Sequence, residues 1–129
     1  MPAALIHEAD ARVTETPNAV MTTLGSPTQG GTSDLSLWRV AMAAGQSGPR
    51  HSFDVEQVWY VASGSAAVVT DEGRVELAPG DTIVLPARGT RQISTDAGVT
   101  FVVAGRASGL ATPSTSEGDG EAVAPPWVV

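Results

Sequence analysis

The chain has 129 residues, of which 42% are hydrophobic and 16% are charged, and its formal net charge is -7. This length fits one domain, and the share of apolar residues is sufficient for a packed core, which argues against wholesale disorder. The negative charge argues against nucleic acid and against an anionic membrane as partners, because both are bound through clustered positive charge.

Two residue types are missing, and this excludes several kinds of chemistry. The sequence has no Cys, which rules out disulfides, thiolate metal sites and cysteine nucleophiles. It has no Lys either, since all seven basic residues are Arg, so a Schiff base on a lysine is ruled out. The N-terminal stretch MPAALIHEAD has no basic region and is interrupted by His7 and Glu8. We therefore expect no secretory signal, no membrane span and a cytoplasmic location.

Residues 1–33 are predicted to form an N-terminal arm followed by a loop. The arm mixes short apolar pieces with turn formers and ends in SPTQGGTS over residues 26–33. Residues 19–24 (AVMTTL) are typical of an edge strand. If this strand pairs with its own domain, Asn18 and Met21 reach the mouth of a pocket. The alternative is that it pairs with a second subunit and makes a dimer.

Residues 34–106 have the pattern of an all-β domain. Short Val-rich segments are separated by Gly, Pro or Asp, and no stretch longer than about ten residues has a helical period. The predicted strands cover residues 35–43, 57–62, 65–70, 74–77, 82–85, 91–94 and 99–104. Strands at intervals of about eight to twelve residues, joined by turns such as DEG and PGD, predict an antiparallel sandwich or barrel.

Residues 107–129 are predicted to form a tail. Residues 107–121 are rich in Ser, Thr, Gly and acidic side chains, which is typical of a flexible acidic surface segment. The tail ends in APPWVV over residues 124–129. We expect the Trp that follows the two prolines to dock, either on its own domain or on a neighbouring subunit.

The stretch from residue 45 to residue 105 resembles the cupin superfamily, whose two halves carry the patterns G-x5-H-x-H-x3-4-E-x6-G and G-x5-P-x-G-x2-H-x3-N. Here the first half reads GQSGPRHSFDVEQVWYVASG over residues 45–64, and the second reads GDTIVLPARGTRQ over residues 80–92. The resemblance implies an antiparallel double-stranded β-helix, that is, a jelly-roll barrel. It also implies self-association as a homodimer.

The chain is similar, within that superfamily, to a group of small single-domain cupins. The shared features are an NA-x-MTTL arm at residues 18–24, a WR strand at residues 38–39, an EQVW core at residues 56–59 and a PPW end at residues 125–127. Small cupin cyclases of secondary metabolism make a biosynthetic role an expectation by analogy.

The metal-binding positions of the motif are mostly substituted. In cupins three His and one Glu converge at the barrel mouth and offer nitrogen and oxygen ligands to a transition metal. His51 matches the first His, whereas Phe53 stands at the second His, Gln57 at the Glu and Arg91 at the third His. Phe cannot coordinate, and a cation repels a metal ion, so the resemblance implies no bound metal or cofactor. A divalent transition metal would need an unusual ligand set of His51, Glu56 and Gln57.

Three of these positions are candidate catalytic residues. His51 can transfer a proton, and Arg91 with Gln57 can stabilise negative charge on a carboxylate, phosphate or enolate. The structural alternatives are a His51 that is merely hydrogen-bonded in the pocket wall and an Arg91 that pairs with an acidic residue at the surface.

Further residues are candidates for substrate binding. If Gln57 points inward, strand alternation sends Trp59 inward as well, either as a wall against a ligand or as core. Arg39 lies in an apolar strand and faces either the pocket or water. The candidate substrate-binding residues are Trp59, Phe53, Arg39, Trp38, Met21 and Gln92.

Four functions remain open from the residues. The first is a metal-independent biosynthetic enzyme of cyclase, isomerase or lyase type that binds its small-molecule substrate in the barrel. The second is a ligand-binding or sensor protein without turnover. The third is a metal-dependent dioxygenase or isomerase with an unusual ligand set, and the fourth is a structural dimer with a filled barrel.

Overall fold

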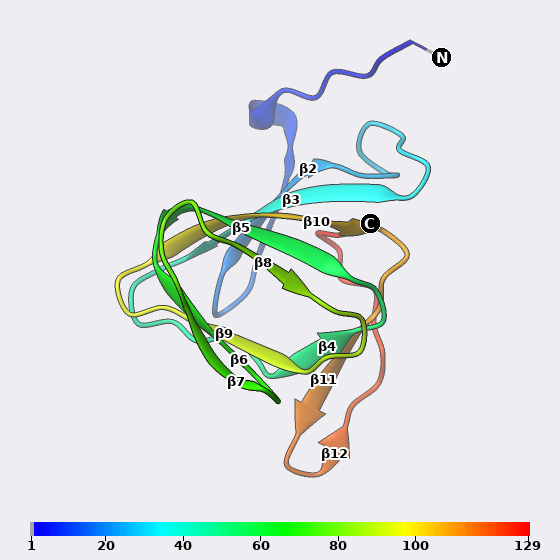
Figure 1. The fold of residues 1–129 in the computed structure, drawn as a ribbon. Coiled ribbons are helices and arrows are strands. Elements are labelled where there is room, and N and C mark those ends of the chain that lie inside the picture. The colour runs from blue at the N-terminus through cyan, green and yellow to red at the C-terminus, as the bar shows by residue number, and fades with distance from the viewer. Residues whose placement is uncertain (1) are drawn as a thin grey trace.

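The computed structural model describes residues 2–129, which form two antiparallel sheets of six strands each (Figure 1). In sheet order, the first sheet contains β1 (Arg12–Glu15), β2 (Val20–Gly25), β3 (Leu35–Met42), β10 (Val99–Arg106), β5 (Gln57–Gly64) and β8 (Thr82–Leu85). The second contains β12 (Gly118–Asp119), β11 (Ala111–Thr115), β4 (His51–Phe53), β9 (Arg91–Ser94), β6 (Ala66–Thr70) and β7 (Gly73–Leu77). The two sheets enclose the core, so the predicted jelly-roll barrel is confirmed.

All the strands that the sequence predicts are present, each within two residues of its predicted ends. Four strands were not predicted: β1, β4, β11 and β12. They are short or contain polar residues and proline, so their local pattern is that of a loop. Among residues 2–129 the single helical element is a 3-10 turn at Glu8–Asp10, and no helix there has the length and apolarity to cross a membrane.

Strand β10 is the centre of the core. It pairs with β3 on one edge and with β5 on the other, which places Val103 opposite both Trp38 and Trp59. Phe101 and Val103 are fully buried, as is Val61 on β5. Burial of each such side chain contributes about 1.5–3 kcal/mol, so these three strands supply much of the stability of the barrel.

Side chains on β5 alternate as expected from the sequence. Gln57, Trp59 and Val61 are buried, whereas Val58 and Tyr60 on the opposite face are 38% and 44% exposed. Because successive side chains of a strand point to opposite faces, an inward Gln57 requires an inward Trp59. The sequence left the orientation of Gln57 open, and the structure has it inward together with Trp59.

The N-terminal arm pairs within its own chain. Strand β2 lies antiparallel to β3, with Val20 opposite Ala41 and Met21 opposite Val40, and β1 adds to the outer edge of β2. Of the two arrangements that the sequence leaves open, the structure has the one in which the arm extends the barrel and places Met21 in the core.

The tail is more ordered than the sequence suggests. The expected flexible segment at 107–121 instead contains β11, which pairs with β4 and so extends the second sheet. The chain end then returns across the barrel (Figure 1). Thr23 donates its hydroxyl hydrogen to the carbonyl oxygen of Trp127 at 2.8 Å, and Val128 is fully buried. The Pro-Pro-Trp end therefore docks on its own domain.

We predict that a methyl group at Gly64, where β5 ends, disrupts the barrel. Gly64 has a φ of 77°, and a Cβ there would lie 2.1 Å from the carbonyl oxygen of Gly98, which is backbone and cannot turn aside. Gly64→Ala should lower the free energy of unfolding by about 2 kcal/mol or more, measured by urea denaturation.

Gly45→Ala is the matched control for this substitution. Gly45 has a φ of 80° but nothing within 4 Å of the added Cβ, so only the backbone preference is lost, about 1 kcal/mol. Equal losses in the two variants would contradict the close approach at Gly64.

Candidate functional site

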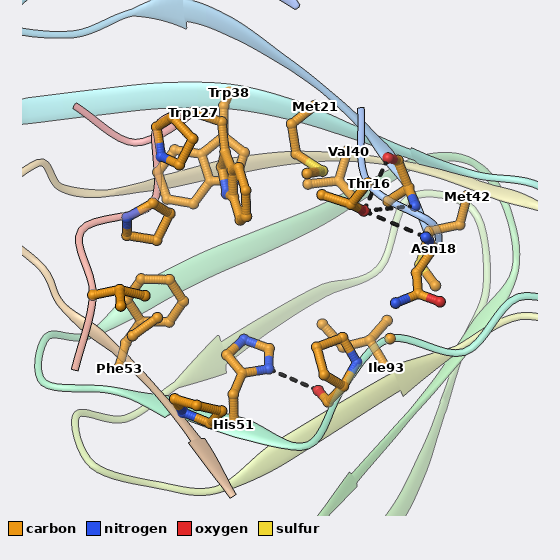
Figure 2. Close-up of a pocket in the computed structure, with 18 of the residues that line it drawn as sticks. Thr16, Asn18, Met21, Trp38, Val40, Met42, His51, Phe53, Ile93 and Trp127 are labelled. Carbon is orange, nitrogen blue, oxygen red and sulfur yellow. Dashed lines mark hydrogen bonds between the residues drawn. The ribbon is translucent and has the colours of Figure 1, made fainter. Parts of the chain in front are cut away.

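A cavity of about 570 Å³ lies inside the barrel between the two sheets (Figure 2). Its volume is in the range of pockets that hold small organic molecules. The lining residues are Met21, Trp38, Val40, Met42 and Trp59 from the first sheet, His51, Phe53, Ile93, Ala111 and Pro113 from the second, residues 16–19 from the arm, Gly48 and Pro49 from the loop before β4, and residues 123–127 from the tail. The wall is almost entirely apolar, so the cavity favours an apolar ligand.

Few polar groups of the described residues reach this cavity. The Thr16 hydroxyl is occupied in its own turn, where it accepts the backbone N–H of Ala19 and donates to the carbonyl oxygen of Ala19. The side-chain amide of Asn18 points into the space (Figure 2). His51 is the single titratable side chain in the lining. Acid–base chemistry by a lining side chain therefore depends on His51.

The His51 ring is oriented by the loop that precedes β4. Its Nδ1 atom lies 2.8 Å from the carbonyl oxygen of Pro49. A carbonyl oxygen can only accept a hydrogen bond, so Nδ1 carries the proton and the lone pair of Nε2 is free. Figure 2 shows the ring projecting into the cavity opposite Trp38 and Met21. His51 thus presents a hydrogen-bond acceptor, and a base, to the cavity.

The surroundings of His51 keep it neutral. Burial lowers the pKa of His51 below its ordinary value of 6.5 and is the largest effect. The hydrogen bond to Pro49 raises the pKa by less than burial lowers it, and the positive charge of Arg91 adds a smaller lowering. At neutral pH the imidazole is therefore in the form that accepts a proton.

Behind the cavity wall, Arg91 and Gln57 form a buried polar pair. Arg91 donates from Nη2 to Oε1 of Gln57 at 2.6 Å, and Trp59 donates from Nε1 to the same oxygen at 3.0 Å. The guanidinium carbon lies 4.9 Å from the centre of the Phe53 ring, which separates it from the cavity. The side chains of Arg91 and Gln57 are each 1% exposed. Arg91 is therefore an interior residue, and the alternative of a surface ion pair is wrong.

Arg91 is a buried cation without a nearby anion. No acidic residue in the described part of the chain forms an ion pair with it. Burial lowers the pKa of Arg91 to about 10, so the guanidinium still carries its charge at neutral pH. The result is a fixed positive charge behind the cavity wall, which stabilises negative charge nearby.

The residues at the four cupin ligand positions do not fit a metal ion. His51 is the one usable ligand, because Phe53 has no donor atom, Arg91 is a cation, and the Gln57 oxygen is occupied by two N–H donors. Glu56, which the sequence suggested as a replacement ligand, is exposed on the outer face of the first sheet. Among residues 2–129 no group of three His, Cys, Asp or Glu side chains is placed to hold a metal.

The predicted substrate-binding residues divide into two groups. Met21, Trp38, Phe53 and Trp59 all line the cavity, as their inward strand positions require. Two others lie outside it, contrary to the prediction.

Arg39 and Gln92 lie on the outward faces of their strands. Arg39 pairs with Glu8 of the N-terminal arm. Gln92 donates its side-chain amide to the carbonyl oxygen of Gly48 at 3.0 Å, which holds the loop before β4. Neither residue contacts the cavity, so substrate binding by these two side chains is not supported by their positions.

The part of the cavity wall that comes from the tail was not predicted from the sequence. Residues 123–127 and Ala111 of β11 line the cavity. Ala111 lies in the segment 107–121 that was expected to be flexible, whereas the end of the chain was expected to dock. The Pro-Pro-Trp end indicated docking, but the sequence did not indicate the surface on which it docks. β11 gave no signal, because a Thr-Pro-Ser sequence does not have the pattern of a strand.

We predict that His51 makes stability depend on pH. Because the pKa of His51 is lowered in the folded protein, the unfolded chain binds a proton more readily, and stability falls as the pH drops below 6.5. His51→Gln removes this component, so its thermal midpoint should decline less on acidification than that of the wild type.

The chain offers a matched control in its other histidine. His7 lies on the exposed arm, so His7→Gln should retain the wild-type dependence of the thermal midpoint on pH. A His51→Gln profile parallel to the wild-type profile would contradict the lowered pKa.

Comparison with proteins of known structure gives several similar barrels. The polyketide cyclase RemF from Streptomyces resistomycificus aligns with a TM-score of 0.70 and 24% identity over 81% of this chain and 80% of that one. The DMSP lyase DddQ from Ruegeria pomeroyi aligns with a TM-score of 0.69 and 19% identity, over 84% of this chain and 68% of that one. At these identities the likeness shows the fold.

A sugar phosphate isomerase of the cupin superfamily from Silicibacter pomeroyi aligns with a TM-score of 0.59 and 23% identity, over 78% of this chain and 74% of that one. No curated protein matches the sequence. The family model of the cupin domain (Cupin_2) matches residues 38–106. That stretch is more than half of the chain and contains β10, β5 and the positions of the degenerate motif, and the protein therefore belongs to the cupin domain family.

Proposed function

We propose that this cupin binds an apolar small molecule in its barrel and acts on it as a biosynthetic enzyme of cyclase, isomerase or lyase type, with His51 as general base. The observation that carries the proposal is a single neutral imidazole, with a free Nε2, in an otherwise apolar cavity. A base whose pKa is lowered by burial is unprotonated at neutral pH and so available for proton transfer.

The proposed chemistry needs few groups. Cyclisation, isomerisation and elimination can each begin when a base removes a proton from carbon next to a carbonyl group. The proton moves from the substrate carbon to Nε2 of His51, and the electron pair of the C–H bond passes to the carbonyl oxygen. The Arg91 charge, held behind Phe53, favours the negative charge that develops there.

The similar structures support the reaction types but not one of them in particular. Those neighbours include proteins named as a polyketide cyclase, a lyase and an isomerase. A second candidate, a binding protein without turnover, is favoured by the presence of one titratable group in the lining. The two candidates share the cavity and differ in whether His51 transfers a proton.

The cavity should bind an uncharged apolar dye. The uncharged solvatochromic dye prodan should bind there, and its fluorescence should shift to the blue. Ala111→Trp places an indole ring in the cavity from β11 and should abolish the shift, because the ring takes the space of the dye. Ala62→Trp is the control, since Ala62 is exposed on the outward side of β5. Equal binding by both variants would place the dye outside the cavity.

His51 should act as a base on a simple carbon acid. 5-Nitrobenzisoxazole is a planar apolar carbon acid that opens to a phenolate when its C–H proton is removed and its N–O bond breaks. The wild type should accelerate this ring opening, and His51→Ala should lower the rate by about 100-fold or more. The rate should rise with pH and level off once His51 is fully neutral.

The affinity for prodan separates the two functions. If the protein is an enzyme of the proposed kind, His51→Ala loses ring-opening activity and retains its affinity for prodan. His7→Gln should retain both the activity and the affinity. A wild type that binds prodan without accelerating ring opening would leave the binding-protein function in place and contradict the enzyme.

A further inference from the structure

Three hydrogen-bond donors of the buried Arg91–Gln57 pair have no acceptor. They are Nε and Nη1 of Arg91 and Nε2 of Gln57, and each is fully shielded from solvent. The two side chains that carry them are joined by the hydrogen bond from Nη2 of Arg91 to Oε1 of Gln57. Buried donors in native proteins nearly always have a partner, and a buried charge without one is particularly unfavourable. The cluster therefore lacks an acceptor, and that acceptor should be negatively charged.

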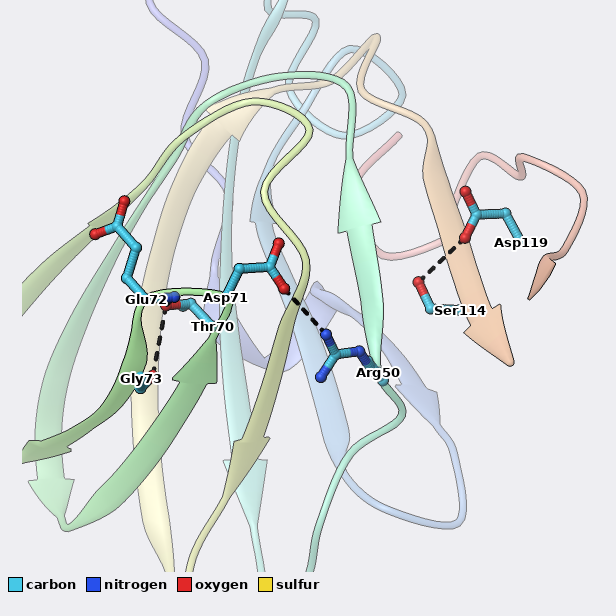
Figure 3. A network of polar contacts seen from close by, with 7 residues as sticks. All are labelled: Arg50, Thr70, Asp71, Glu72, Gly73, Ser114 and Asp119. Carbon is cyan, nitrogen blue, oxygen red and sulfur yellow. Dashed lines mark hydrogen bonds and ion pairs between the residues drawn. The ribbon is translucent and has the colours of Figure 1, made fainter. Parts of the chain in front are cut away.

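The protein does not supply this acceptor from its own acidic residues. On the strands that flank β9, the residues opposite Arg91 are His51 of β4 and Thr70 of β6, and neither is acidic. Asp71, which follows Thr70, forms an ion pair with Arg50 at 3.1 Å on the outer surface (Figure 3). Asp54 accepts the backbone N–H of Leu110. The missing negative charge thus has to come from outside the chain.

The cluster lies directly behind the cavity wall. Phe53 covers the guanidinium with its ring and lines the cavity with the same side chain. Trp59 donates to Gln57 and also lines the cavity. The rings of Phe53 and Trp59 therefore lie between the donors and the cavity, and direct contact with a ligand requires Phe53 to adopt another rotamer.

We propose that the ligand of this cavity is an apolar monocarboxylate, and that the buried Arg91–Gln57 pair is the subsite that receives its carboxylate group. This inference rests on the proposed function, since it names part of the ligand of the same cavity. The guanidinium has unpartnered N–H groups on Nε and Nη1, each of which can donate a charge-assisted hydrogen bond to a carboxylate, and the Gln57 amide adds a further donor. The apolar body of the ligand then fills the space between Trp38 and His51.

The net charge of the chain opposes binding of an anion. At -7 the protein as a whole repels anions, so a preference for a carboxylate over a neutral group of the same shape has to come from a local cation. Among the described residues that line the cavity or lie directly behind it, Arg91 is the cation in position to provide it.

The test compares two ligands that share one ring system. Binding of 2-naphthoate and of 2-naphthamide is measured by displacement of prodan and by calorimetry on the full chain. The wild type should bind the carboxylate about tenfold or more tightly than the amide, as expected for charge-assisted hydrogen bonds. Arg91→Met should remove this preference while leaving the affinity for the amide.

Arg50→Met is the matched control, because it removes the same charge from an exposed position near β4 (Figure 3). It should keep the preference for the carboxylate. Equal affinities for the two ligands in the wild type, or a preference that persists in Arg91→Met, would overturn the proposal and would assign the acceptor to buried water. The wild-type comparison decides this even if Arg91→Met does not fold.

Failure of this proposal is distinguishable from failure of the proposed function. Prodan and 2-naphthamide are uncharged, so they report on the cavity without the carboxylate subsite. If both bind and 2-naphthoate binds no more tightly than 2-naphthamide, ligand binding in the cavity is supported and the carboxylate subsite is contradicted. If neither uncharged molecule binds, the proposed function fails as well.

Discussion

The antiparallel pairing of β10 with β3 on one edge and β5 on the other determines which side chains enter the barrel. Val103 stands opposite both Trp38 and Trp59, so the two indole rings are brought to the same side of the core from strands far apart in sequence. Alternation along each strand then follows, with Gln57 inside and Tyr60 outside. A shift of one residue in either pairing would expose the cavity wall and bury the outer face.

This framework explains how the barrel accommodates a cation at the place where other cupins offer metal ligands. Arg91 points inward because its position on β9 requires it, and the Gln57 oxygen and the face of the Phe53 ring are its partners. These contacts compensate only part of the cost of burying a charge. Its charge adds to the effect of burial, which is the main cause of the lowered pKa of His51, and favours negative charge in the cavity. The substitutions thus replace a metal-binding arrangement with a different electrostatic one.

The cavity is completed by the two ends of the chain. The arm contributes β2 and residues 16–19, and the tail contributes residues 123–127, which the Thr23 hydroxyl holds through the carbonyl of Trp127. The central barrel alone would leave this side of the space open to solvent. Segments that are distant in sequence thus complete the apolar wall that faces His51.

Local patterns in the sequence were sufficient for the all-β fold and for placing Gln57 and Trp59 on the same face of their strand, because strand periodicity is a local property. The substitutions of metal ligands at Phe53 and Arg91 were identified from the resemblance to cupins. Local patterns did not determine whether Arg91 is buried or at the surface, or that Arg39 faces Glu8.

Only the tertiary structure decided those questions, together with the roles of β11 and the tail. Which face of a strand is covered, and by what, depends on pairing between segments that are distant in sequence. The residues of a short Thr-Pro-Ser strand do not indicate which strand it pairs with. The sequence by itself therefore determined the barrel and its missing metal ligands, and long-range packing decided which residues line the cavity and which cation lies behind it.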